Sequence, residues 1–149
     1  CCVQHVKTSN RFMSMPAYRN RIIGLQMYKY DIKGFLHWGY NFYNSQYSRY
    51  KINPYITTSS DMAFPSGDPF SVYPSADGPL ASTRARIFFL ALQDIRICKL
   101  LEKHIGKRAV IDLIESEAGM EISFTQYPRN SDFLPDISEN LISELKKYI

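Results

Sequence analysis

The sequence predicts an α/β fold, and three observations support this prediction. Apolar side chains recur at helical spacing over residues 17–30, which indicates an amphipathic helix. An apolar run over residues 35–40 has no polar alternation, as is typical of a strand covered on both faces. A short turn joins the two, and this order of helix, turn and strand is typical of a βα repeat. The length of 149 residues fits one domain spanning residues 1–149.

The first half of the chain is predicted to hold one helix and two strands. Pro16 suits the first turn of the helix over 17–30, because its missing N–H costs nothing there. The strand over 35–40 leads into residues 44–69, a segment with three prolines that is too long for an ordinary connection. Loops of this length inside compact domains are usually functional. A second short strand is expected over 70–73, and it ends at Pro74.

The second half is predicted to be mainly helical. Ser82 is a candidate N-cap for a long helix over 83–104, which is expected to end near Gly106. A further helix is expected over 107–115, and residues 117–127 fit either a loop or a short extended segment. Pro135 begins a last amphipathic helix over 135–148.

Composition argues against several classes of function. The net charge of +4 is modest and the basic residues are scattered, so we expect no nucleic-acid partner. No apolar segment reaches the roughly 20 residues that span a bilayer, so we expect no membrane partner. The cysteines Cys1, Cys2 and Cys98 show no C-x-x-C spacing, and no Gly-rich phosphate loop or nucleophile elbow occurs. We therefore expect no metal site and no cofactor.

The segment over residues 34–43 is the first candidate binding element. It contains Trp38, the only tryptophan, together with Tyr40, Asn41 and Tyr43, and Tyr73 follows the second predicted strand. A sugar ring presents C–H patches that stack on aromatic faces and hydroxyls that pair with amides and phenols. These side chains therefore predict a carbohydrate site, although Trp38 also fits a large core residue.

The acidic residues offer no obvious catalytic pair. Glycosidases usually need two carboxyl groups, or one acid with a second group that orients a substrate acetamide. Asp61, Asp68 and Asp77 are isolated in predicted loops. Asp68 fits either hydroxyl binding or bracing of the turn at Gly67, and His37 fits a core histidine better than a catalyst. We therefore assign no catalytic residue within this chain.

Four motifs in order carry a family resemblance. They are residues 10–21 (NRFMSMPAYRNR), 34–41 (GFLHWGYN), 67–74 (GDPFSVYP) and 126–129 (QYPR). With these motifs the chain resembles the C-terminal part of the DUF4091 family, which is similar to the catalytic domain of glycoside hydrolase family 123, a family of β-N-acetylgalactosaminidases.

The resemblance implies a partial (β/α)8 (TIM) barrel of about the last three βα units plus C-terminal helices. Cys1 and Cys2 would end the sixth strand, residues 35–40 would form the seventh, and residues 70–73 the eighth. The implied activity is substrate-assisted, retaining hydrolysis of an N-acetylhexosaminide, in which an adjacent Asp-Glu pair orients the acetamide and protonates the leaving group. This sequence contains no Asp-Glu dipeptide. We therefore expect an inactive C-terminal fragment that contributes sugar-binding aromatics.

Two further expectations follow from an incomplete barrel. An open sheet leaves strand edges and an apolar face uncovered, so self-association of the isolated chain is expected. The alternative function is a non-catalytic carbohydrate-binding or scaffold domain that uses the same aromatic surface.

Overall fold

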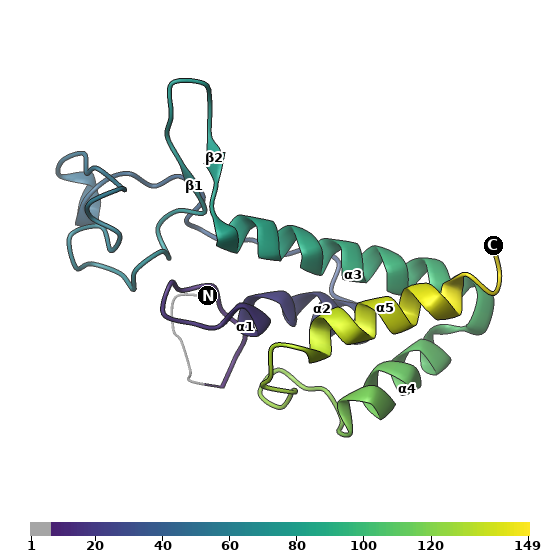
Figure 1. The fold of residues 1–149 in the computed structure, drawn as a ribbon. Coiled ribbons are helices and arrows are strands. Elements are labelled where there is room, and N and C mark those ends of the chain that lie inside the picture. The colour runs from purple at the N-terminus through teal and green to yellow at the C-terminus, as the bar shows by residue number, and fades with distance from the viewer. Residues whose placement is uncertain (1–6) are drawn as a thin grey trace.

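The computed structural model describes residues 7–149, and it divides into a helical half and a loop half (Figure 1). The predicted strand end at Cys1 and Cys2 lies outside the described residues. The helical half consists of α1 (Ala17–Arg21), α2 (Ile23–Lys29), α3 (Thr83–Ile105), α4 (Lys107–Ala118) and α5 (Phe133–Leu145). The loop half covers residues 31–82 and holds the short helix η1 (Gln46–Ser48) with the strands β1 (Val72–Tyr73) and β2 (Leu80–Ala81).

Local sequence signals set the limits of the long helices. The Ser82 side chain accepts a hydrogen bond from the Ala85 N–H and so caps α3, as predicted. Gly106 separates α3 from α4 with a φ of 82°, and Gly119 ends α4 in the left-handed conformation. The predicted helix over 17–30 is divided at Ile22 into α1 and α2. The last helix begins at Phe133, two residues before the predicted start.

The main cluster of buried apolar residues lies between the helices and the loop that joins α4 to α5. In Figure 1, α3 runs along the whole helical half, and α1, α2, α4 and α5 pack against it. The buried core cluster consists of Ile22, Leu25, Tyr28, Cys98, Leu101, Val110, Ile114, Ile122, Tyr127, Phe133, Leu134, Ile137, Leu141 and Leu145. Burial of these side chains is the main source of stability in this half.

Two contacts fix how the helices approach one another. Arg21 of α1 forms two hydrogen bonds to Asp94 of α3, at 2.8 and 2.9 Å, and a third to Ser138 of α5 at 2.6 Å. Asp94 is only 2% exposed, so this ion pair is buried between three helices. Gly24 packs so closely on α3 that an added Cβ would lie 2.3 Å from the Ala91 carbonyl oxygen.

The sheet differs from the prediction. β1 pairs with β2 as an antiparallel hairpin, so only part of the strand predicted over 70–73 is formed. The strand predicted over 35–40 is absent, and this segment approaches its neighbour through one antiparallel bridge between Asn41 and Phe70. An apolar run becomes a strand only where a second strand pairs with its backbone, and within residues 35–40 only the Tyr40 carbonyl has such a contact, with residues 71 and 72.

The combination of helices with a small sheet agrees with the broad α/β class. No parallel strand pair occurs within residues 7–149, so the partial barrel stays a prediction from the family resemblance. The loop half contains all six non-glycine residues with positive φ in the described part of the chain. No helix among these residues is long and apolar enough to cross a bilayer.

Candidate functional site

Asp68 is the central polar residue of the loop half. Its side chain is 1% exposed, and its two carboxylate oxygens accept from two different rings. Trp38 donates its indole N–H to Oδ2 at 3.0 Å, and His37 Nε2 lies 3.1 Å from Oδ1. Gly39 packs directly on this turn, because an added Cβ would lie 2.3 Å from the Asp68 carbonyl oxygen. Asp68 therefore holds residues 37–39 in place.

Trp38 lies at the edge of a small aromatic cluster. Its ring centroid is 4.6 Å from that of Phe64 and 5.5 Å from that of Phe42. The side chain is half-buried, so it fits in part both alternatives raised by the sequence, a core residue and a ligand-facing aromatic. One part of the indole packs in the cluster, and the remainder stays accessible to a ligand. The hydrogen bond to Asp68 fixes the orientation of the indole ring before a ligand arrives. Little conformational entropy of this side chain would therefore be lost on ligand binding.

A second aromatic group, the tyrosine cluster, surrounds Phe70 and consists of Tyr40, Tyr43, Tyr55 and Tyr73. The Phe70 ring lies 5.8 Å from Tyr43 and 5.2 Å from Tyr73. The ring centroids of Tyr55 and Tyr73 are 5.1 Å apart. Burial raises the pKa of Tyr43, and its neighbours Tyr40, Tyr55 and Tyr73 raise it further. Tyr43 therefore lies close to the other three tyrosines.

Backbone contacts hold the tyrosine cluster. The Tyr43 hydroxyl donates to the Val72 carbonyl at 2.8 Å, and the Tyr55 hydroxyl donates to the Pro74 carbonyl at 2.7 Å. Tyr40 is 59% exposed, and its backbone carbonyl accepts from the Ser71 N–H. The cluster therefore presents aromatic surface to solvent while its base is fixed on β1.

The structure brings the six predicted site residues together in two adjacent groups. Trp38 joins Asp68, and Tyr40 and Tyr43 join Tyr73. Asn41 lies between the groups with an exposed side chain, and its backbone bridges to Phe70. The positions of these residues do not show whether they bind a ligand, so their roles stay predictions.

Sequence reasoning missed Tyr55 and Arg11. Tyr55 belongs to the aromatic-rich region, but its contact with Tyr73 depends on the path of a long irregular loop that has no periodic pattern. Arg11 precedes α1 by several residues, and nothing in the local sequence indicates that its guanidinium is buried. His37 was expected to be a core histidine, and its side chain is indeed only 8% exposed and pairs with Asp68.

A cavity of about 370 Å³ lies between the start of α3 and residues 35–40. Arg11 lines it and is 7% exposed, with its guanidinium carbon 4.9 Å from the Phe35 ring centroid and 4.5 Å from the Phe88 centroid. Burial lowers the pKa of Arg11 to about 10. The other lining residues are Phe35, His37, Gly39, Tyr40, Ser71, Ala85, Phe88, Phe89 and Leu92.

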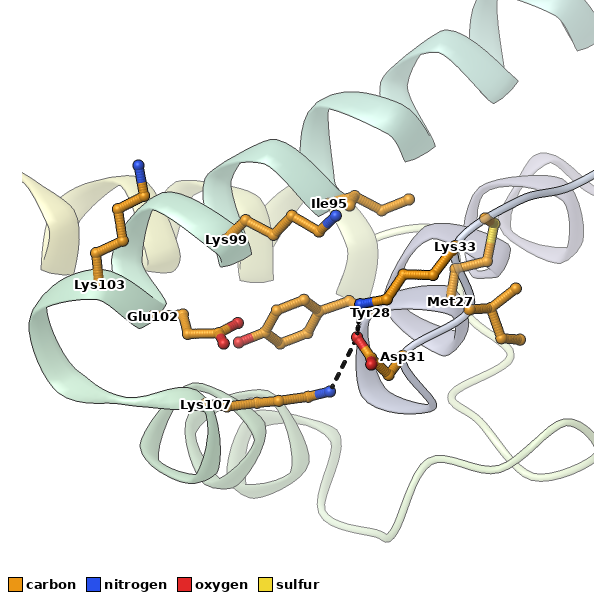
Figure 2. Close-up of a pocket in the computed structure, with 10 residues that line it drawn as sticks. Met27, Tyr28, Asp31, Lys33, Ile95, Lys99, Glu102, Lys103 and Lys107 are labelled. Carbon is orange, nitrogen blue, oxygen red and sulfur yellow. Dashed lines mark hydrogen bonds and ion pairs between the residues drawn. The ribbon is translucent and has the colours of Figure 1, made fainter.

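Another hollow, of about 420 Å³, lies at the opposite end between α2 and α3 (Figure 2). Figure 2 shows the Tyr28 hydroxyl pointing toward the Glu102 carboxylate and Lys107 reaching Asp31 at 3.7 Å. Lys33 also pairs with Asp31. This surface alternates charges of both signs and has no exposed aromatic face, so it is unsuited to sugar stacking. The remaining lining residues are Met27, Ile32, Ile95, Lys99 and Lys103.

The acidic groups of the loop half do not form a reactive pair. Asp68 has both oxygens engaged, and Asp61 accepts a hydrogen bond from the Tyr50 hydroxyl. No group of three His, Cys, Asp or Glu residues suited to a metal occurs within residues 7–149. Within the described residues, Asp61 and Asp68 therefore do not form a pair of free carboxylates for acid and base steps.

Comparison with known families identifies one match. A family model described as glycoside hydrolase 123, catalytic domain, matches residues 1–101. The matched range contains all six predicted site residues and ends within α3. A search of curated proteins finds no match. The resemblance to glycoside hydrolase family 123 is thereby confirmed, and the link to DUF4091 stays a prediction.

Proposed function

The chain belongs to the family of the glycoside hydrolase 123 catalytic domain, and from this premise we propose that its loop half forms one wall of a carbohydrate-binding site. One observation carries the proposal: the buried Asp68 carboxylate fixes the half-buried Trp38 ring, two residues before the exposed Tyr40 of the tyrosine cluster. Fixed aromatic faces beside phenol and amide groups match the alternating C–H and hydroxyl surface of a sugar.

Each residue of this wall has a distinct role in the proposal. Trp38 and Tyr40 stack on the sugar ring, because both keep exposed aromatic surface. Asn41 supplies an amide, and the hydroxyls of Tyr43 and Tyr73 pair with sugar hydroxyls or with the acetamide. Asp68 acts as a positioning residue, since its oxygens are already occupied by Trp38 and His37.

The family resemblance supports an N-acetylhexosaminide of the N-acetylgalactosamine type as the ligand, and retaining, substrate-assisted hydrolysis as the reaction. In this chemistry the acetamide oxygen attacks the anomeric carbon while carboxyl groups orient it and protonate the leaving group. The 149 residues contain no Asp-Glu pair, and Asp68 is sequestered. The isolated chain should therefore bind sugar without turning it over.

A non-catalytic carbohydrate-binding domain is the second candidate. The engaged oxygens of Asp68 favour it, because a protonating acid must be free to reach the glycosidic oxygen. The two candidates share the same binding wall and differ in the origin of the acid. An upstream Asp-Glu pair at a strand end in a longer polypeptide would support the hydrolase, and its absence would support the binding domain.

We also propose that the isolated chain self-associates. The two-stranded sheet leaves β2 exposed at its edge, and unpaired strand edges favour pairing with another chain. Exposed apolar side chains such as Leu36 and Ile56 add to this tendency. Light scattering should show a species larger than 17.3 kDa, and a clean monomer would contradict the proposal.

Titration with N-acetylgalactosamine tests the binding wall. Trp38 is the single tryptophan, so its fluorescence should change saturably as sugar binds. Galactose, which lacks the acetamide, serves as the comparison ligand. In calorimetry, Trp38→Ala should weaken binding by about threefold to tenfold, in line with the energy of one aromatic contact.

The matched control for Trp38→Ala is Tyr148→Ala, which removes an exposed aromatic side chain at the end of the helical half. Its affinity should equal that of the wild type. If neither the fluorescence nor the heat of titration of the wild-type chain changes with added sugar, the proposed binding wall is contradicted. Release of sugar from an N-acetylgalactosaminide by the isolated chain would overturn the claim that it lacks the catalytic acid.

A further inference from the structure

Arg11 is a buried cation for which the described residues provide no acceptor. It is 7% exposed, and none of the hydrogen bonds within residues 7–149 uses its guanidinium. Within the described residues, the only polar contact of Arg11 is that of its backbone N–H with the Asn10 side chain at 2.8 Å. None of its guanidinium nitrogens is among the fully buried side-chain atoms that lack a partner, so these donors stay accessible and a ligand can accept from them.

The rings around Arg11 hold the guanidinium in a fixed orientation. Phe35 lies on the loop half and Phe88 on α3, and each contacts the cation through its ring face at less than 5 Å. Such contacts stabilise the charge without using its N–H groups. The donors therefore stay available at the wall of the 370 Å³ cavity, which Arg11 lines.

The charges around the cavity leave a net positive site. Asp68 raises the pKa of Arg11, but the stronger effect of burial and the neighbouring Arg84 lower it. The carboxylate of Asp68 faces His37 and Trp38, and Arg84 donates to the Phe70 carbonyl at 2.8 Å. Neither residue contacts the Arg11 guanidinium directly, so an anion entering the cavity can bond to it without displacing an existing partner.

The remaining walls decide which anion fits. Phe88, Phe89 and Leu92 of α3 present apolar surface, and Tyr40 adds an aromatic edge from the loop half. A small inorganic anion would leave this surface wet, whereas an organic acid fills it. A planar carboxylate also matches the two parallel N–H groups of a guanidinium.

We propose that the cavity between α3 and residues 35–40 is a binding site for a carboxylate carried on an apolar or ring framework, with Arg11 as its bidentate anchor. This goes beyond the proposed sugar wall, because it uses Arg11, the apolar face of α3 and a different recognition chemistry, and it shares only Tyr40 with that wall. Two sources share this chemistry. One is a small aromatic or aliphatic carboxylic acid, and the other is the uronate residue of an acidic glycan.

Calorimetric titration of the 149-residue chain at constant ionic strength tests the site. Benzoate and glucuronate are the anionic probes, and benzamide and glucose are their neutral counterparts. At least one anion should bind saturably and about tenfold or more tightly than its neutral counterpart, because charge-assisted bonds dominate the affinity. Benzoate binding alone indicates a small acid, and glucuronate binding indicates an acidic glycan.

Arg11→Met retains an apolar side chain of similar length and removes the guanidinium group, so it should weaken anion binding by about tenfold or more. Arg96→Met removes an exposed arginine of α3 and should leave affinity within about twofold, since surface charges away from the site act weakly. Far-ultraviolet circular dichroism checks that both variants are folded.

Phe89→Glu gives an independent test if Arg11→Met does not fold. Phe89 is 56% exposed at the cavity wall, so a carboxylate there should spare the core and exclude an anionic ligand. Loss of anion binding in this variant supports the site. Unchanged affinity in a folded Arg11→Met chain or in Phe89→Glu, equal binding of charged and neutral probes, or no saturable binding of either anion would overturn the proposal.

Discussion

The two halves of the molecule use the same types of side chain for different purposes. In the helical half, apolar residues from four helices form one continuous core, and the buried ions are paired between helices. In the loop half, most aromatic residues other than the buried Phe70 keep exposed surface, and Trp38, Tyr43 and Tyr55 are held by individual hydrogen bonds to Asp68 or to backbone carbonyls. The contrast indicates that one half supplies stability and the other presents fixed aromatic surface.

The comparison also explains why the loop half does not need a core of its own. Its strands are two residues long. The Asp68 side chain connects the segment over 37–39 to the turn in which Asp68 lies. Arg84 near the start of α3 donates to the Phe70 carbonyl, so the loop half is fixed directly to the helical half. Substitutions should therefore affect stability strongly in one half and ligand binding in the other.

The largest effect is expected at Asp94. Asp94→Ala leaves Arg21 partly buried without its counter-ion, which should lower the free energy of unfolding by about 3–5 kcal/mol. Asp112→Ala is the control, because Asp112 pairs with Arg108 on the exposed face of α4 and should change stability by less than about 1 kcal/mol. Urea unfolding followed by circular dichroism measures both. Equal losses would contradict the assignment of stability to the buried ion pair.

A smaller effect is expected at Asp68. Asp68→Ala removes the acceptor of both Trp38 and His37, which should cost about 1–3 kcal/mol and shift Trp38 emission toward that of an exposed indole. Asp77→Ala, in the exposed hairpin turn, should leave emission and stability unchanged. Unaltered Trp38 emission in Asp68→Ala would show that the carboxylate does not position the ring.

A pH dependence specific to the helical half is expected from Cys98. Burial raises the pKa of its thiol to about 12, and the Asp94 charge adds to this. The unfolded thiol ionises near about pH 8.5, so the stabilisation is complete below that pH and is lost as pH rises toward the folded pKa. This contribution should fall by about 1–2 kcal/mol by about pH 10.

The variant Cys98→Ala isolates this contribution. It has a lower stability at neutral pH because a small cavity replaces the sulfur atom, but its free energy of unfolding should decline less steeply between about pH 8 and 10 than that of the wild type. Urea titrations at several pH values measure the two slopes. Parallel slopes would mean that the folded thiol titrates normally and is more accessible than its contacts indicate.

The smallest stability effect is expected at Tyr40. Tyr40→Ala removes an exposed ring and should change the free energy of unfolding by less than about 0.5 kcal/mol. Binding of N-acetylgalactosamine should nevertheless weaken by about threefold to tenfold. Tyr47→Ala is the control within the same half, since Tyr47 contacts the Arg49 side chain outside the tyrosine cluster. Equal sugar affinities in the two variants would remove Tyr40 from the wall.

Much of the helical half could be predicted from sequence. Ser82 caps α3, Gly106 separates it from α4, and Cys98 is buried, because periodicity and capping act within a few residues. Residues 35–40 were wrongly predicted as a strand, since apolar composition does not reveal whether a pairing strand exists. The pairing of Trp38 with Asp68 spans 30 residues of irregular loop, and no local pattern encodes such a contact.

The most direct test of the division between a stable half and a binding half is a map of backbone amide shifts in the nuclear magnetic resonance spectrum during titration with N-acetylgalactosamine. We predict saturable shifts confined to residues 37–43, 55 and 68–73, with α4 and α5 unchanged. Shifts centred on the lysine-lined hollow between α2 and α3, or no shifts at any residue, would contradict the account.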